Sequence, residues 1–427
     1  ISERKSEGKP KPAGDSVGFF NLICPQKNRI LIIVTSLRRR FVMRNWKKVL
    51  SVTAAAAVAA TAAMPTAVFA EGDETFKIGV IGPMTGDYAQ YGTNVYNAAK
   101  IAADEINEAG GFNGYQVEVL DAGDDMGDPE KAVNAYNDLL DKGMQMLCGA
   151  TTSGSCIAVG AEAAESTFLF TPSATAVDSI TAGSNEFRMC FTDPAQGAKS
   201  AQYIGENKLA AKVAVIYDSS DVYSSGIEAN FVKEAQNQGL EVVAEEAFTA
   251  DSKTDFSTQL QKAQSAGAEL VFLPIYYTEA SIILTQADSM GYAPTFFGCD
   301  GLDGLLGVEN FNTELAEGVM LLTPFAADAE DEKTQKFVSA YKEAFDNQIP
   351  IQFAADAYDA VYAIKLAAED AGLTPDMEIS DMCEAMKVSM TNIELEGLTG
   401  TITWDETGEP DKEPKAVIIE DGAYKAM

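Results

Sequence analysis

Hydroxyl-bearing side chains stand at the ends of several apolar runs, and they are the residues of this sequence best suited to binding chemistry. Ser153 follows the run at 144–149. Ser173 and Thr175 follow the run at 167–172. Ligands of open α/β sheets bind beyond the carboxyl ends of such strands, and hydroxyls with backbone N–H groups at a helix start can hold a carboxylate without arginine. Plain helix capping is the alternative for any single serine, so both interpretations stay open.

A carboxylate occupies a similar place in the second half of the chain. Asp300 comes directly after the apolar run TFFGC and directly before Gly301. It can face the cation of a ligand, or it can be an ordinary cap or turn residue, and the residues alone leave both open. Tyr223 and Tyr276 also follow apolar runs and add phenolic hydroxyls. The candidate set therefore combines neutral donors with one acid.

The stretch FKIGVIGPMTGDYAQYG, which starts at Phe76, predicts a strand, a loop and then an amphipathic helix after Gly92. This order suits a nucleotide site, but the glycines do not. Gly79, Gly82 and Gly86 have the spacing G-x-x-G-x-x-x-G, whereas the dinucleotide fingerprint is G-x-G-x-x-G. The phosphate loop G-x-x-x-x-G-K-[ST] does not occur in this stretch either. The loop is therefore not expected to bind a nucleotide, and a glycine turn that binds no ligand at all stays an alternative.

The composition argues against most catalytic designs. The 427 residues include no histidine, which removes histidine triads, histidine metal ligands and the usual general base near neutral pH. The six cysteines form no C-x-x-C pair, and most lie in apolar runs that predict small buried side chains rather than a disulfide scaffold. We expect no cofactor, no metal site and no enzymatic activity.

Charge is divided unevenly along the chain. Residues 1–70 contain 12 of the 31 basic residues and 3 of the 64 acidic ones, so the rest carries 19 basic and 61 acidic residues. Only one of those 19 is an arginine, Arg188. A body this acidic repels phosphate backbones and anionic lipid, which argues against nucleic acid and membrane surfaces as partners.

Residues 43–70 are interpreted as a secretory signal peptide. Basic residues precede an apolar core of small residues, and the segment ends in the A-x-A-like sequence VFA. Cleavage is predicted between Ala70 and Glu71, which would place the mature chain in the periplasm or outside the cell. Residues 1–42 lie upstream of a credible start methionine and are interpreted as a non-native extension.

From residue 76 onward, predicted strands and helices alternate in two successive series. This pattern is typical of parallel sheets covered by helices on both faces. The predicted fold class is α/β, with two Rossmann-like lobes whose parallel-rich sheets are joined by a hinge. The expected boundaries are 71–192 plus about 323–395 for lobe 1, and 193–322 plus about 396–427 for lobe 2.

Six stretches carry a specific resemblance: KIGVIGPMTG, DEINEAGG, DDMGDPEKAV, FTPSAT, DFSTQL and GLTGTITWDETGE. On these stretches, residues 76–427 resemble the Leu/Ile/Val-binding proteins of amino-acid ABC importers, which are type I periplasmic binding proteins. The resemblance implies a monomer that captures a branched-chain or related amino acid between two lobes and delivers it to membrane permease subunits.

The resemblance also implies a role for each polar candidate. Ser153 and Thr175 would hold the α-carboxylate of the ligand. The backbone of Ser173 would meet the ammonium group. Asp300, with Tyr276, would clamp that ammonium from the second lobe. A zwitterion would then meet neutral donors at one end and one carboxylate at the other, so few charges are buried unpaired.

Two aromatic residues and two departures from the family pattern complete this picture. Tyr91 and Tyr223 would form walls of the side-chain pocket. Gly127 and Thr152 occupy positions where some family members have paired cysteines, so that disulfide is not expected. The clamp on the ammonium is often Glu in the family and is the shorter Asp300 here, which leaves the preferred side chain open.

Two other functions also remain open at this point. The same lobes could present a ligand to a signalling receptor instead of a permease. They could also bind another small polar solute, such as urea or an amide.

Overall fold

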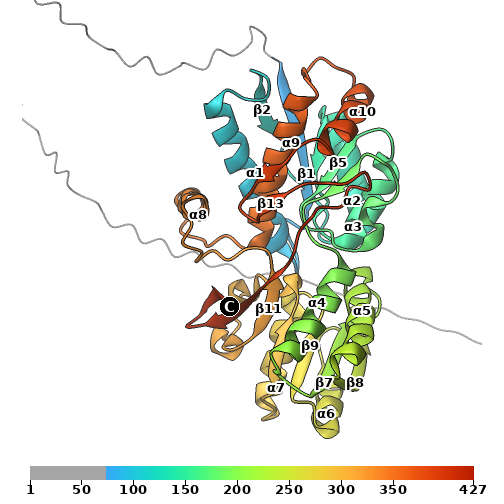
Figure 1. Ribbon diagram of the computed structural model, residues 1–427, viewed down its shortest axis with the longest axis vertical. Coiled ribbons are helices and arrows are strands. Elements are labelled where there is room, and N and C mark those ends of the chain that lie inside the picture. Colours follow the sequence, from blue (N-terminus) through green and yellow to red (C-terminus); the bar gives the residue numbers. More distant parts are fainter. Residues whose placement is uncertain (1–73) are drawn as a thin grey trace, which may run out of the picture. The chain divides into compact units, whose positions relative to one another are not determined.

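The computed structural model describes residues 74–427 (Figure 1). Its first sheet has six strands, all paired in parallel, in the order β2-β1-β4-β5-β6 with β3 beside the end of β1. The strands are β1 (Thr75–Gly82), β2 (Gln116–Val119), β3 (Gly123–Asp124), β4 (Met146–Cys148), β5 (Phe168–Thr171) and β6 (Glu186–Arg188). The apolar runs of the sequence form these strands because both faces of a parallel sheet are buried.

Helices cover both faces of this sheet. Along β4 and β5, Met146 and Phe170 pack into the core formed with α1 and α9, while Leu147 and Leu169 face α2 and α3. This alternation is the two-residue period of a strand. Figure 1 shows α9 beside α1, although the two helices are far apart in the sequence. The helices are α1 (Ala89–Ala109), α2 (Pro129–Asp141), α3 (Ser153–Ala163), α8 (Glu332–Ala344), α9 (Gln352–Asp370) and α10 (Ile379–Met390).

The second sheet has seven strands in the order β15-β14-β11-β10-β9-β7-β8. The five strands from β11 to β8 are parallel, and β14 and β15 add an antiparallel edge. The strands are β7 (Lys212–Asp218), β8 (Glu241–Phe248), β9 (Leu270–Leu273), β10 (Thr295–Gly298), β11 (Met320–Thr323), β14 (Lys415–Glu420) and β15 (Ala423–Ala426).

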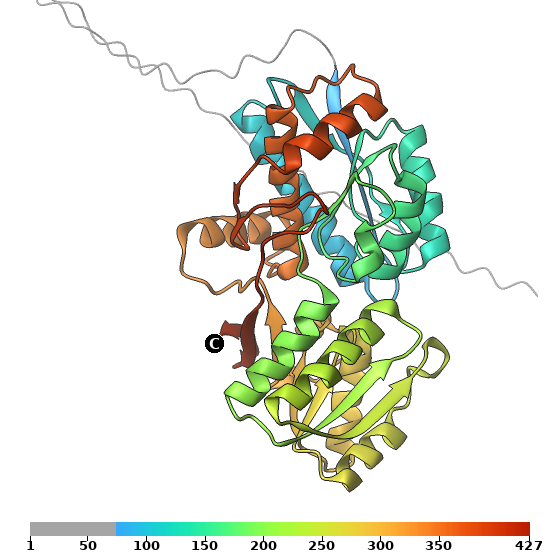
Figure 2. The same ribbon diagram turned by 45° about the vertical axis from the view of Figure 1, so that its right-hand side comes forward.

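Two pairs of helices sandwich this second sheet. Helices α4 and α5 lie side by side on one face, as Figures 1 and 2 show. Helices α6 and α7 pack with the residues of the other face, such as Ile216 and Val271. The helices are α4 (Asp193–Glu206), α5 (Val222–Gln238), α6 (Ser257–Ala266) and α7 (Tyr277–Ser289). Single turns of 3-10 helix are η1 (Val177–Ile180), η2 (Ala250–Ser252), η3 (Asp300–Leu302), η4 (Leu305–Gly307) and η5 (Thr313–Ala316).

The predicted fold class is confirmed, because the described residues form two α/β lobes with parallel-rich sheets. We call the six-stranded sheet with its helices the first lobe and the seven-stranded sheet with its helices the second lobe.

The lobe boundaries remain a proposal, and we place the last boundary, where the chain returns to the second lobe, later than the sequence indicated. The hairpin of β12 (Leu395–Glu396) and β13 (Thr401–Ile402) precedes Trp404, whose indole N–H donates to the Arg188 carbonyl at 2.7 Å. We therefore propose that the second lobe regains the chain at β14 rather than at about residue 396.

Two helices begin earlier than the sequence indicated. The helix predicted to follow Gly92 starts at Ala89, so Tyr91 and Gly92 lie in its first turn. Gly92 is needed there for close approach, because a Cβ atom would lie 2.4 Å from the Pro83 carbonyl oxygen. Ser153 was expected to follow a strand and precede a helix, and it is itself the first residue of α3. No helix was predicted at the positions of α4, α7 and α10.

All five cysteines of the described residues are buried and free, as their apolar surroundings predicted. Burial raises the pKa of the Cys148 thiol to about 12 and that of Cys156 to about 12. The thiols therefore act as small apolar side chains in the cores of the lobes.

Replacing Lys412 by Met should destabilise the fold, because Asp356 would stay buried without its cation. The Lys412 Nζ lies 2.6 Å from Asp356 Oδ1, and both side chains are 2% exposed. Removing one partner of a buried ion pair costs about 3–5 kcal/mol. Lys425→Met is the control, since its pair with Asp421 lies at the surface, and it should leave the free energy of unfolding nearly unchanged. Urea unfolding followed by circular dichroism measures both variants, and equal losses would contradict this assignment.

Candidate ligand-binding site

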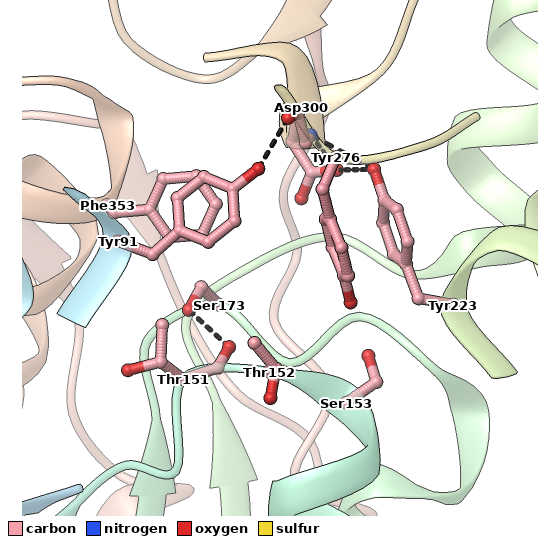
Figure 3. A pocket seen from close by; sticks show the side chains of 10 residues that line it. Tyr91, Thr151, Thr152, Ser153, Ser173, Tyr223, Tyr276, Asp300 and Phe353 are labelled. Carbon is pink, nitrogen blue, oxygen red and sulfur yellow. Dashed lines mark hydrogen bonds between the residues drawn. The ribbon is translucent and has the colours of Figure 1, made fainter. Parts of the chain in front are cut away.

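A small cavity lies between the two lobes, at the carboxyl ends of parallel strands of both sheets (Figure 3). It is lined by hydroxyl-bearing, aromatic and acidic residues. The ten lining residues are Tyr91, Thr151, Thr152, Ser153, Ser173, Tyr223, Tyr276, Asp300, Gly301 and Phe353. The cavity thus brings together six of the seven predicted site residues.

The first lobe contributes a group of hydroxyls and a helix N-terminus. The Ser173 hydroxyl donates to the Thr151 carbonyl at 2.8 Å, and the Ser153 hydroxyl oxygen accepts the Ala176 N–H at 3.1 Å. The Thr152 side chain does not cap α3, and its buried hydroxyl has no hydrogen-bond partner among the described residues. The first N–H groups of a helix lack intrahelical acceptors and carry the positive end of its dipole. This end of the cavity is suited to an anionic group.

A buried arginine fixes the loop behind these hydroxyls. The Arg188 guanidinium donates to the carbonyls of Ala174, Ala176 and Val177 at 2.9–3.1 Å. Its Nε also lies 3.1 Å from a carboxylate oxygen of Glu409. A planar guanidinium can satisfy several fixed acceptors at once, which a lysine cannot do. Because the loop begins at Ser173, Arg188 sets the position of a cavity wall without lining the cavity.

The second lobe contributes an acid that is held by hydrogen bonds. The Tyr223 hydroxyl and the Gly301 N–H donate to Asp300 Oδ1 at 2.7 and 2.8 Å. The Asp300 N–H in turn donates to the Gln196 side-chain oxygen at 3.1 Å. Asp300 is 3% exposed, and this burial raises its pKa to about 7 although the Tyr223 hydrogen bond opposes the shift. A cation placed beside Asp300 would restore its ionised form.

Aromatic rings form the remaining walls. Tyr91 of α1 stacks on Phe353 of α9 with ring centroids 4.1 Å apart, and Tyr223 stacks on Tyr276 at 4.8 Å with an angle of 10° (Figure 3). The Tyr91 hydroxyl donates to the Gly301 carbonyl at 2.5 Å, so a residue of the first lobe contacts the segment that carries the acid. These walls are suited to an apolar side chain.

Thr175 is the one predicted site residue that does not line the cavity. It is 1% exposed, and its carbonyl accepts the Asp193 N–H at 2.9 Å. Asp193 is equally buried, and neither of its carboxylate oxygens has a well-directed hydrogen-bond partner among the described residues. Burial raises the pKa of Asp193 well above its usual range. A second, unpaired acid therefore lies behind the cavity, and the sequence did not point to it.

Four lining residues were missed, for different reasons. Thr151 and Thr152 lie next to Ser153 at the same strand end, so the rule that selected Ser153 applies to them too. Gly301 follows Asp300 and contributes its backbone. Phe353 opens an apolar helix, and such an aromatic residue is indistinguishable from a core residue in the sequence. The ligand-binding roles of all these residues remain a prediction.

The described residues offer neither a candidate metal site nor a membrane-spanning helix. No group of three or more His, Cys, Asp or Glu residues within 74–427 could hold a metal ion. No helix in this range is both long enough and apolar enough to cross a membrane. The cavity has hydroxyls and a helix N-terminus at one end, the buried acid Asp300 at the other, and aromatic walls between them.

Comparison with known sequences identifies similar proteins. A family model described as periplasmic binding protein matches residues 75–417. Leu/Ile/Val-binding protein homolog 3 of Brucella melitensis is 32% identical over 367 residues, which are 84% of this chain and 94% of that protein. The leucine-, isoleucine-, valine-, threonine- and alanine-binding protein of Pseudomonas aeruginosa is 31% identical, covering 79% of this chain and 87% of that protein.

Solved structures agree with these sequence matches. The leucine-binding protein of Thermotoga maritima has a TM-score of 0.74 and 28% identity, and the match covers 83% of this chain and 98% of that chain. A branched-chain amino acid transporter substrate-binding protein of Streptococcus pneumoniae, in complex with isoleucine, has a TM-score of 0.75 and 29% identity with the same coverage. The resemblance predicted from the sequence is confirmed, and this chain belongs to the periplasmic binding protein family.

Proposed function

We propose that this protein captures leucine, isoleucine, valine or a related amino acid between its lobes and delivers it, as a monomer, to the permease of an ABC importer. The observation that carries this proposal is the cavity with hydroxyls and a helix N-terminus at one end and the buried Asp300 at the other. The names of relatives at 31–32% identity support the same ligand class.

The ligand carboxylate is proposed to bind at the first-lobe end. Ser153 and Ser173 line that end, and the first N–H groups of α3 supply further donors. Thr175 would act from one layer behind, through its backbone or after a small local shift. Hydrogen bonds to an ionised group are about twice as strong as neutral ones, so a few of them can hold a carboxylate.

The ligand ammonium is proposed to bind at Asp300. Its free oxygen and the ring of Tyr276 face the cavity. Burying an ionised acid is costly unless a cation accompanies it, so the site favours ligands that bring one. Tyr91, Tyr223 and Phe353 would then enclose an aliphatic side chain.

The family places such proteins outside the cytoplasm. The signal peptide at 43–70 and cleavage after Ala70 lie outside the described residues and remain predictions.

Isothermal titration calorimetry tests the ligand class. The protein is unfolded and refolded to remove bound solute, then titrated with Leu, Ile, Val, Ala, Thr, Phe and Glu, with urea and a short amide as controls. Tight binding of Leu, Ile or Val supports the proposal, whereas binding of urea or the amide alone would overturn the zwitterion clamp. Mass spectrometry of the recovered ligand should find it unaltered, and a product would indicate an enzyme. A pull-down that finds a receptor without a permease would favour sensing.

Asp300→Asn should weaken binding of the preferred amino acid about 100-fold, because a hydrogen bond to a charged group contributes about 1.5–3 kcal/mol. The variant keeps the size of the side chain and should unfold like the parent. Asp255→Asn is the matched control, since Asp255 lies in the same lobe, is exposed and only caps Ser257. Equal affinities of the parent and the Asp300→Asn protein would refute the clamp.

Affinity should also depend on pH. Burial raises the pKa of Asp300 to about 7, so without a ligand cation beside it the acid is ionised above that pH and protonated below it. Binding an ammonium below pH 7 must release this proton, and the Kd should rise about tenfold per pH unit as the pH falls. Above pH 7 the Kd should be flat. Calorimetry in buffers of different ionisation enthalpy measures the number of protons released, because the observed heat of binding changes in proportion to that number. Burial also raises the pKa of Asp303 to about 7, so a slope that persists in Asp300→Asn would assign the proton to another acid.

A further inference from the structure

Four side chains form a charged cluster outside the cavity. The Lys253 Nζ lies 3.2 Å from Asp87 Oδ2 and 3.4 Å from Glu279 Oε1. It also donates to the Tyr88 hydroxyl oxygen at 3.0 Å and lies 5.0 Å from the centre of the Tyr88 ring. The Tyr88 hydroxyl donates to Glu279 Oε1 at 2.8 Å. One ammonium group thus holds two acids and a tyrosine.

These four residues come from both lobes. Asp87 and Tyr88 lie in the loop between β1 and α1 of the first lobe, whereas Lys253 follows η2 and Glu279 lies in the first turn of α7, both in the second lobe. The Thr278 hydroxyl adds another crossing bond, to the Asp87 carbonyl at 2.7 Å. Every contact that Lys253 makes with Asp87 and Tyr88 therefore requires the lobes to be closed.

The acid of the Lys253–Glu279 pair is buried, whereas in the pair that crosses between the lobes the Asp87 side chain is 59% exposed. Glu279 is 3% exposed, and its Oε2 has no hydrogen-bond partner among the described residues. Burial raises the pKa of Glu279, while the charge of Lys253 opposes this shift. Burial alone would lower the pKa of Lys253, but the charges of Glu279 and Asp87 outweigh it and raise the pKa. The second lobe thus holds a mostly desolvated acid that depends on Lys253 for its charge balance, and closure adds Asp87 and Tyr88 to that pair.

The cluster lies one layer away from the cavity. None of its four members lines the cavity, but the Tyr88 ring packs against Tyr276, with centroids 4.8 Å apart and an angle of 62°. Tyr276 is a cavity wall. The cluster therefore has no direct contact with a ligand, and any influence on binding must pass through closure of the lobes or through this tyrosine contact.

We propose that Lys253 is a positioning residue that latches the two lobes closed on the ligand and sets how slowly the ligand leaves. We call Asp87, Tyr88, Lys253 and Glu279 the latch. A ligand can shift an equilibrium only toward the state it binds better, and contacts made only in the closed state add to that preference. Since the latch does not touch the ligand, it should act on every amino acid of the panel to a similar extent. The proposal rests on the proposed function for the identity of the ligand.

The test compares ligand release from four proteins: the parent, Lys253→Met, Lys253→Arg and Asp87→Asn. Stopped-flow displacement measures the dissociation rate of the amino acid that binds best. Lys253→Met keeps the aliphatic stem and removes the charge, so release should become about 10-fold faster with little change in the association rate. Lys253→Arg should restore slow release. Asp87→Asn changes only the first-lobe partner and should shift release in the same direction by a smaller factor.

Lys262→Met is the matched control. Lys262 also belongs to the second lobe, and its ammonium lies 2.6 Å from Glu246 of the same lobe, so its loss should leave release unchanged. Lys253→Met also removes the countercharge of the buried Glu279 in its own lobe, so its melting temperature should fall below that of Lys262→Met, whereas Asp87→Asn removes only a contact between the lobes and should leave the melting temperature unchanged. Added salt should accelerate release from the parent more than from Lys253→Met, as expected for an ion pair.

Two results would overturn the latch. One is unchanged release from Lys253→Met, and the other is a lowered melting temperature with unchanged release, which would assign Lys253 to the stability of its own lobe. If the parent binds no amino acid, the proposed function fails separately. Small-angle scattering of the ligand-free parent and Lys253→Met then decides the latch: a larger radius of gyration in the variant supports it, and equal radii refute it.

Discussion

The burial of the Asp300 carboxylate is the constraint on which the rest of the site depends. A carboxylate removed from water needs hydrogen bonds and a countercharge. The hydroxyl of Tyr223 and the N–H of Gly301 provide the hydrogen bonds. Nearby cations are engaged elsewhere, since Arg188 binds loop carbonyls and Lys412 pairs with Asp356. These cations are not available to Asp300, so we propose that the ammonium of a ligand supplies its countercharge.

The short turn that carries Asp300 also contacts the other lobe. Turn η3 begins with Asp300, and the carbonyl of the next residue, Gly301, accepts the hydroxyl of Tyr91 from the other lobe. Tyr91 in turn stacks on Phe353 of a helix that returns to the first lobe late in the chain. The position of the acid and the approach of the lobes are thus fixed by one set of contacts. The latch at Lys253 adds a second set of contacts between the lobes, one layer away from the cavity. Contacts near the cavity and contacts farther from it would thus both support the closed form.

Much of this arrangement could be predicted from the sequence because parallel strands share one carboxyl edge. Ser153, Ser173, Tyr223, Tyr276 and Asp300 all follow apolar runs, and that rule places them together. The rule cannot find Phe353, because its helix reaches the cavity only through tertiary packing. The sequence also indicated starts for α1 and α3 that are too late. For α1 the reason is Gly92, which allows a close approach to Pro83 inside the helix and does not mark the end of the preceding loop. The latch joins loops of both lobes, and no periodic pattern marks such charges.

The five buried thiols have a consequence for a protein that works outside the cytoplasm. Only thiolates exchange with disulfides, and burial raises the thiol pKa to about 12 at Cys148 and to about 11 at Cys383. The thiols of the described residues are therefore protected from oxidants and thiol reagents in the folded state, whereas unfolding of residues 74–427 exposes five of them. In an oxidising compartment rapid folding would therefore be favoured, because a molecule that stays unfolded can be trapped by wrong disulfides. The rate of thiol labelling would correspondingly report how often each core opens.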